Sequence, residues 1–414
     1  MKKKLRIIFV WTLVSLLLQF GAYSLLNNQV QKVMAPVTSE PITLQLKATI
    51  PSADLTNVQI SYAKDYIAYS EKGTLKVFNL KKQKNVFEKE SPSVDDKALG
   101  VLTYQWLPDR NTLIYFYAKK NPNPITYVTD YPPKSTQQPT TQSTTPKTED
   151  PNEKTTVSKD TTKEVPVKPR TKIRYGNPQL TELYTLELPD SDEDTAPDDR
   201  FNQTIDQFPA GGEIEEWVVS TYTNLMYLTV KNGSKEQLME IDVMKNVRTL
   251  NKSGETIDNM AASDRYGTLY LDSKVGSTQQ VLALNGTKRQ TISKNDNDRI
   301  LGIRDGKVYI GEVENDVLVK IKTTADLSEV KSNPVLNTEW VGSIPFDNTQ
   351  RTVIGSKGQI VVYDHLTAYI VTAGQLKEVN LHGDDNYISV DGAELIQLTR
   401  EETFTEAELQ PLNS

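Results

Sequence analysis

The sequence predicts an all-β fold, and three observations support this. The 414 residues include 19 Tyr, and strand-favouring Val and Thr are mixed with turn-forming Gly, Asn and Asp. Apolar and polar residues alternate with a period of two over many short segments, as in strands with one buried face. Dipeptides such as Asn232-Gly233, Asn285-Gly286, Asp305-Gly306 and Asp391-Gly392 separate these segments and tolerate the positive φ of tight hairpins. The pattern indicates many short antiparallel strands.

A unit of about 40 residues recurs along the chain in imperfect copies, a spacing typical of β-propeller blades. The clearest copy begins at Tyr62, where Ile67 and Tyr69 alternate with Ala68. Further copies begin near Trp106, Thr223, Ser263, Leu301, Thr352 and Asn386. We therefore predict a propeller of six to eight blades, with seven favoured. A row of β-sandwich domains with similar strand spacing is the alternative.

The two ends of the repeat region are expected to meet in one blade, because closing the ring removes exposed sheet edges. The segment Ile42 to Ile50 and the last hairpin, from Asn386, are the candidates for this joint. We place the propeller over residues 42–400 and a C-terminal tail over residues 401–414.

The N-terminus predicts a transmembrane signal anchor. Residues 1–6 are basic and residues 7–26 carry no charge, which is long enough to cross a bilayer as a helix. A stalk over residues 27–41 would follow, with the N-terminus cytoplasmic and the propeller extracytoplasmic. A cleaved signal peptide is the alternative, although its best site, after Ala35, is followed by Pro36. The absence of Cys excludes lipoprotein processing and favours a Gram-positive-like bacterial envelope.

Residues 119–172 predict a disordered insert. Thr, Pro, Ser, Gln, Lys and Glu dominate this segment, so it cannot bury enough apolar surface to offset its ordering entropy. The strands on either side of it, which end near Tyr117 and begin near Leu180, are expected to pair across the insert. Its composition is similar to that of cell-wall-spanning stalks, and a neutral insertion is the alternative.

The turn after Trp106 resembles a known propeller repeat. Trp106, Pro108 and Asp109 match the Trp-Ser-Pro-Asp-Gly-Lys motif of the TolB-type periplasmic propellers and of the propeller half of prolyl-oligopeptidase-type peptidases. Leu107 and Arg110 depart from that motif. The resemblance implies a blade corner and no chemistry. The peptidases' catalytic domain has no room here, and the Gly-x-Ser-x-Gly motif is absent.

Composition and motifs exclude several function classes. The formal net charge of −7, without a basic cluster beyond the N-terminus, argues against a nucleic-acid partner. The sequence lacks Cys, a Walker A loop and Gly-x-Gly-x-x-Gly. We predict no catalytic residue, no metal site and no cofactor.

Three weaker patterns are expected to be structural. His365, in a segment that resembles a strand, and His382, in a loop, are too few for a typical zinc site. Asp190, Asp192 and Asp194 start a calcium-loop spacing, but Thr195 and Phe201 replace its Gly and Glu. Ser-x-x-Lys occurs at Ser61–Lys64 and Ser328–Lys331 without the accompanying penicillin-interacting motifs.

The sequence therefore favours a non-catalytic, extracytoplasmic binding or scaffolding propeller of the cell envelope, which contacts a protein or glycan through its rim loops. A glycan hydrolase or lyase using acidic residues at the channel mouth is one alternative. The sensory ectodomain of a membrane complex is another. No binding residue can be named from sequence alone.

Overall fold

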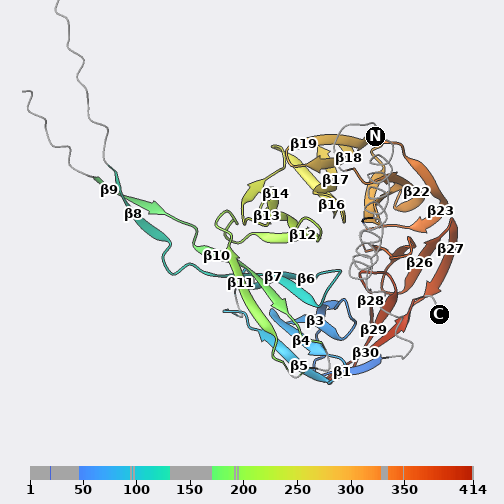
Figure 1. The fold of residues 1–414 in the computed structure, drawn as a ribbon, viewed down its shortest axis with the longest axis horizontal. Helices are drawn as coiled ribbons and strands as arrows, with labels where there is room; N and C mark the ends of the chain where they lie inside the picture. The colour runs from blue at the N-terminus through green and yellow to red at the C-terminus, as the bar shows by residue number, and fades with distance from the viewer. Residues whose placement is uncertain are drawn as a thin grey trace, which may run out of the picture.

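The computed structural model describes residues 19, 46–93, 96, 98–130, 170–190, 193, 195–327, 334–347 and 349–412. Over these residues the chain forms seven four-stranded antiparallel sheets and one two-stranded sheet. The seven sheets stand around a central axis as the blades of a β-propeller (Figure 1). The predicted fold class and the favoured number of seven blades are confirmed.

Strands follow one another from the axis outward within each blade. Blades 1 and 2 contain β2 (Thr56–Ile60), β3 (Tyr66–Glu71), β4 (Thr74–Asn79) and β5 (Lys84–Lys89), then β6 (Gly100–Trp106), β7 (Thr112–Lys120), β10 (Gln179–Glu187) and β11 (Asp198–Thr204). Blades 3 and 4 contain β12 (Glu213–Ser220), β13 (Leu225–Asn232), β14 (Lys235–Ile241) and β15 (Val247–Thr249), then β16 (Glu255–Ala262), β17 (Thr268–Val275), β18 (Thr278–Asn285) and β19 (Lys288–Ser293). Blades 5 and 6 contain β20 (Asp298–Arg304), β21 (Lys307–Glu314), β22 (Val317–Ala325) and β23 (Asn337–Pro345), then β24 (Arg351–Ile354), β25 (Ile360–Tyr363), β26 (Thr367–Thr372) and β27 (Gln375–Asn380).

Blade 7 joins the two ends of the propeller. It contains β28 (Asp385–Ile388), β29 (Glu394–Arg400), β30 (Thr405–Pro411) and, as its outer strand, β1 (Leu46–Ile50). Ile50 pairs with Thr405, so the predicted joint between the chain ends is present. The predicted boundary at residue 400 needs correction, because β30 lies beyond it. Its buried Ala407 and Leu409 alternate with polar residues, which is the pattern of a strand and not of a tail.

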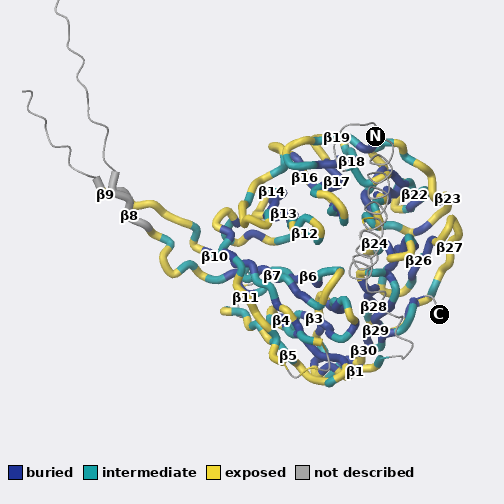
Figure 2. The backbone as a smooth tube through the Cα atoms, viewed as in Figure 1, coloured by how far each residue is buried: buried dark blue, intermediate teal, exposed yellow. Residues whose placement is uncertain are grey.

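Hydrophobic side chains pack between neighbouring blades, and the described residues form seven such clusters around the ring. In β3, Ile67 and Tyr69 pack against blade 7, whereas Tyr66 and Ala68 pack against blade 2. Successive side chains of a strand point to opposite faces, so each blade contributes to two clusters. Buried stretches accordingly occur in every blade (Figure 2).

The ring has two faces with different connections. Turns between the first and second strands, and between the third and fourth, lie on one face. Turns between the second and third strands, and the links to the next blade, lie on the other, which we call the insert face. On the first face, Asp305-Gly306 joins β20 to β21 with φ of 49° and 72°, as predicted for a type I′ turn.

Blade 2 carries a hairpin that the other blades lack. Between β7 and β10, strands β8 (Ile125–Asp130) and β9 (Arg170–Tyr175) pair and project away from the ring (Figure 1). β7 and β10 pair across this excursion, as predicted. The two ends of the predicted insert, 119–172, therefore include strand residues, and β8 in particular is rich in strand-favouring Ile, Thr, Tyr and Val. Residues 131–169 lie outside the described residues.

The predicted anchor and stalk also fall outside the described residues, apart from Gln19. Within the part of the chain that the structure describes, no helix combines the length and the apolar character needed to cross a bilayer.

Candidate functional site

The axial channel is bounded by the seven inner strands, and β-bulges decide which side chains reach it. The inner strands of blades 1 to 5 each carry a register shift against their neighbours. In β12 the pairing passes from Ile214↔Val230 to Glu216↔Thr229, so Glu215 has no partner residue. A bulge re-aims side chains. As a result, both Glu215 and Glu216 line the channel.

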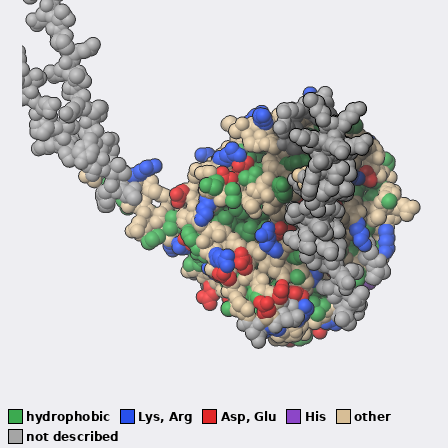
Figure 3. Space-filling model, in the orientation of Figure 1, with side chains coloured by type: hydrophobic (Ala, Val, Ile, Leu, Met, Phe, Trp, Pro, Cys, Tyr) green, Lys and Arg blue, Asp and Glu red, His purple; other side chains and the backbone are tan. Residues whose placement is uncertain are grey.

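A cavity of about 1030 Å³ opens at the insert face beside blades 3 to 6, and we call it the axial groove. Charged side chains of both signs line it. The acidic ones are Glu215, Glu216, Glu236, Asp258, Asp316 and Asp347, and the basic ones are Lys231, Lys274, Arg299 and Arg351. In the space-filling view, acidic and basic side chains lie close together over the visible part of the ring (Figure 3). The groove is thus suited to a polar or charged ligand.

The axial groove continues toward blades 1, 2 and 7. A second cavity of about 480 Å³ is lined by residues of β2, β6 and β28 and shares Glu215, Glu216 and Arg351 with the groove. Since β12 and β24 belong to blades 3 and 6, these shared side chains stand on opposite sides of the channel. A ligand in the groove would therefore meet them at the junction of the two cavities.

Glu216 is the least satisfied carboxyl group of the axial groove. One of its oxygens accepts a hydrogen bond from the Met260 amide at 3.3 Å, and Oε2 is buried with no hydrogen-bond partner. Burial raises the pKa of Glu216 to about 8, although the Met260 amide opposes this, and nearby Asp272 adds to the rise. Glu216 is therefore largely protonated at neutral pH and can donate a hydrogen bond.

Asp272, next to this site, has a structural role. Its side chain is fully buried and accepts hydrogen bonds from the Ile300 amide at 2.9 Å and from Asn259 Nδ2 at 3.3 Å. Burial raises its pKa to about 7, and the two donors oppose the rise. Asp272 thus ties β17 of blade 4 to β20 of blade 5.

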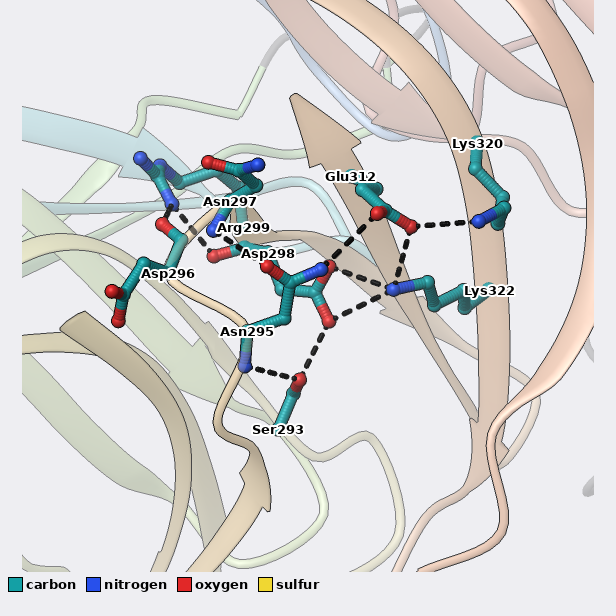
Figure 4. A network of polar contacts seen from close by, with 9 residues as sticks. All are labelled: Ser293, Asn295, Asp296, Asn297, Asp298, Arg299, Glu312, Lys320 and Lys322. Carbon is teal, nitrogen blue, oxygen red and sulfur yellow. Dashed lines mark hydrogen bonds and ion pairs between the residues drawn. The ribbon is translucent and has the colours of Figure 1, made fainter. Parts of the chain in front are cut away.

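A network of ionised side chains in blade 5 adjoins the axial groove at Arg299, but its Asp298, Glu312, Lys320 and Lys322 do not line the groove (Figure 4). Lys322 Nζ lies 2.8 Å from Asp298 Oδ1 and 2.9 Å from Glu312 Oε2. Lys320 also pairs with Glu312, at 2.9 Å, and the Ser293 hydroxyl donates to Asp298 at 2.6 Å. Hydrogen bonds from the two lysines lower the pKa of Glu312 to about 2. Every member has partners, so this network holds blade 5 together.

The histidines singled out in the sequence do not come together as a site. Contrary to the strand expected from sequence, His365 lies in the turn between β25 and β26, where its carbonyl oxygen accepts from Asn386 Nδ2 at 2.8 Å. His382 is exposed in the link from β27 to β28. Across the described ranges, no group of three or more His, Asp or Glu could hold a metal ion.

The other sequence patterns are structural or fall outside the described residues. Lys64 is buried in the β2–β3 turn, where Nζ pairs with Asp391 at 3.0 Å and Glu394 at 3.3 Å, so it fixes blade 1 to blade 7. Asp190 precedes a loop whose Asp192 and Asp194 lie outside the described residues, as do Ser328 and Lys331.

The Trp106 turn forms the blade corner that its resemblance implied. β6 ends at Trp106 and β7 begins at Thr112, and the Leu107 amide donates to the Thr112 carbonyl oxygen at 2.9 Å. Trp106 is buried, and its indole nitrogen donates to the carbonyl oxygen of Gln59 in blade 1, at 3.2 Å.

No protein-family model matches the chain. A search of curated proteins likewise finds no match. Among solved structures, the chain is similar to the β-propeller domain of Cps50 (Swd1) from Myceliophteria_thermophila, with 10% identity, 88% of this chain and 99% of that chain covered, and a TM-score of 0.47.

Two further solved structures are similar in architecture. One is a prolyl endopeptidase, at 14% identity with 84% of this chain covered and a TM-score of 0.43; this chain spans 47% of its length. The other is TolB from Acinetobacter baumannii, at 8% identity, with 85% of this chain and 79% of that chain covered and a TM-score of 0.39. These similarities concern the ring architecture alone, which the strand pairing establishes independently.

Proposed function

We propose that this protein is a non-catalytic, extracytoplasmic binding or scaffolding propeller of the cell envelope, held in the membrane through residues 7–26. Its partner is a protein or a glycan of the envelope, bound at the insert face. A ring of rigid blades suits this role, because turns on a fixed scaffold present a broad surface without reorganisation on binding.

The axial groove is the observation that carries this proposal. Its charged lining comes from blades 3 to 6, so residues far apart in sequence converge on one cavity of about 1030 Å³. The hairpin of blade 2 rises from the same face, since it replaces a turn between second and third strands. A partner could contact the groove and the hairpin together.

Capture from detergent-solubilised envelope extract tests the proposal. The full-length chain serves as bait beside a variant in which residues 121–178 are replaced by an Asn-Gly turn, which leaves the pairing of β7 with β10 possible. We expect a saturable partner to be captured by both if the groove carries binding, and by the full chain alone if the hairpin is needed. If neither bait retains a saturable partner, the proposed binding role is overturned.

An enzyme that cleaves glycans is the second candidate, and Glu216 favours it. A glycoside hydrolase needs one carboxyl group that stays protonated at neutral pH to act as general acid, and the raised pKa of Glu216 meets that need. Glu215 and Asp258 line the same cavity and would supply the second carboxylate. Turnover of an envelope glycan by the wild type that Glu216→Gln abolishes, without loss of folding, would establish this candidate instead.

A further inference from the structure

Two arginines of the axial groove are held in place without forming an ion pair among the described residues, although Arg299 lies close enough to the buried Asp272 to oppose the rise that burial causes in its pKa. Arg299 lies at the start of β20, where Nη1 donates to the carbonyl oxygens of Asp296 at 2.7 Å and Asp298 at 2.9 Å (Figure 4). Carbonyl oxygens orient the guanidinium group but carry no net charge. Among the described residues, no carboxylate forms an ion pair with Arg299.

Arg351 is also held in place, but by an aromatic ring and not by carbonyl oxygens. Its guanidinium carbon lies 5.0 Å from the centroid of the Tyr387 ring, a cation–π contact that fixes its orientation. No ion pair of Arg351 with a carboxylate occurs within the part of the chain that the structure describes. Hydrogen bonding to Tyr363 and Tyr387 engages part of the Arg351 donor fork, and neither arginine spends its fork on a carboxylate of the described residues.

Elsewhere in the propeller, cations that contact buried carboxylates form ion pairs, whereas Arg299 is half-buried and Arg351 is exposed to the cavity. Arg289 binds Glu255 at 2.5 Å, Arg248 binds Glu240 at 2.5 Å, and the buried Lys64 has two carboxylate partners. Glu255 and Glu240 are almost fully buried, as expected when a charge has a counter-charge. Arg299 and Arg351 lack such partners in the described residues and instead face the cavity.

The two arginines lie on adjacent inner strands, β20 and β24, and line the same cavity. Planar guanidinium forks bind carboxylate and phosphate groups through paired hydrogen bonds. We propose that Arg299 and Arg351 form an oxyanion-binding site, which takes a carboxylate or phosphate group of the ligand. This inference rests on the proposed binding role of the groove and names the chemistry of what binds there.

Two of the carboxyl groups around the axial groove, those of Glu215 and Glu216, do not oppose this site. Glu215 is paired with Lys231 at 2.8 Å, whereas hydrogen bonds from Thr349 lower the pKa of Asp347 and keep it charged. Glu216 is largely protonated, which lowers the negative charge on the blade 3 side, and burial also raises the pKa of Glu236. Asp258, Asp316 and Asp347 are the remaining acidic groups in the lining. Lys274 adds a further cation from blade 4.

Calorimetry on the full-length chain tests the site, with citrate and pyrophosphate as probes at constant ionic strength. We expect at least one probe to saturate the wild type at millimolar concentration, and the stronger probe to identify the carboxylate or the phosphate as the ligand group. Removal of one charge-assisted fork, in Arg299→Gln or Arg351→Gln, should weaken binding about tenfold or more. Arg351→Lys should lose an intermediate amount, because the charge stays and the fork is lost.

Arg200→Gln is the matched control, because Arg200 is exposed on β11 and far from the groove lining. Its affinity should equal that of the wild type. Binding of neither probe to the wild type, or equal binding by wild type and folded Arg299→Gln and Arg351→Gln, would overturn the proposal. Capture of an envelope partner that both arginine variants retain would leave the binding role intact and refute only the oxyanion site.

Discussion

The ionised side chains of the blade 5 network all have partners, whereas some polar and charged groups of the axial groove lack them among the described residues. In the network, Lys322, Asp298 and Glu312 are largely buried and each has close partners of opposite charge (Figure 4). In the groove, Arg351 lacks a carboxylate partner among the described residues, and Glu216 has a buried oxygen that accepts no hydrogen bond. The network lies in blade 5, and Glu216 and Arg351 belong to blades 3 and 6, but all three blades are four-stranded antiparallel sheets, so the difference lies in the side chains and not in the fold.

We infer from this difference that the blade 5 network contributes to stability and that the axial groove contributes to binding. A satisfied buried network contributes to one defined packing of the blade, and removing a member leaves an uncompensated charge. Unsatisfied groups that face a cavity contribute little to folding, but they keep hydrogen-bonding capacity for a ligand. Variants in the two regions should therefore affect different measurements.

The largest expected effect is the loss of Lys322. Lys322→Met leaves Asp298 fully buried without its cation, so the free energy of unfolding should fall by about 3–5 kcal/mol. Urea denaturation measures it. Lys320→Met is the matched control, because Glu312 keeps Lys322 as its partner in that variant. Equal losses of unfolding free energy in the two variants would contradict the stabilising role assigned to the pair of Lys322 with the buried Asp298.

Glu216→Gln should change how the free energy of unfolding depends on pH. The pKa of Glu216 is about 8 in the folded state against 4.5 for a free side chain, so the folded state binds more protons between these values. Stability of the wild type should therefore fall as pH rises from 4.5 to 8, and the variant should escape this loss, which amounts to about 3 kcal/mol at pH 7. Thermal unfolding at pH 5, 7 and 9 measures the difference, in which the titration of Asp272 cancels. A difference that does not change with pH would contradict the assigned environment of Glu216.

Arg351→Gln should have a small effect on stability. The variant loses a cation–π contact with Tyr387 and hydrogen bonding to Tyr363 and Tyr387 but no ion pair, so the free energy of unfolding should change by about 1–2 kcal/mol. The same urea titration applies. A loss as large as that of Lys322→Met would mean that Arg351 supports the fold.

The smallest effect is expected for an exposed ion pair. Arg200 pairs with Glu187 and Asp198 on the surface of blade 2, where solvent and salt screen the charges. Arg200→Gln should leave the unfolding midpoint unchanged at low and at high salt. A salt-dependent loss would indicate that surface pairs contribute to blade stability.

Local patterns in the sequence were sufficient for the architecture. Alternation in β3, tight turns such as Asp305-Gly306 and the pairing of β7 with β10 are short-range or repeated features, so periodicity and turn chemistry predict them. The third strand of blade 7, Thr405–Pro411, was missed although it alternates, because Ala407 and Leu409 are its only buried apolar residues. So weak a pattern is distinguished from a tail only when its neighbours in the ring are known.

The axial groove could not be predicted in the same way. Glu215 and Glu216 reach the channel together because a bulge in β12 breaks the period of two, and no motif announces that bulge. Arg299 and Arg351 are 52 positions apart in the sequence. They line one cavity only because successive inner strands stand side by side around the axis. Two adjacent glutamates, Glu215 and Glu216, interrupt the alternation of the strand EIEEWVVS, and that interruption, although no motif, is a sequence signal of the bulge.

The most direct test of the account is pyrophosphate and citrate affinity measured on Arg351→Gln and Lys322→Met side by side, at a temperature where both are folded. We predict that Arg351→Gln binds the preferred probe about tenfold more weakly or worse, whereas Lys322→Met binds it as the wild type does. Wild-type affinity in Arg351→Gln, with the loss in Lys322→Met instead, would contradict the division between charges that hold the blades and charges that bind a ligand.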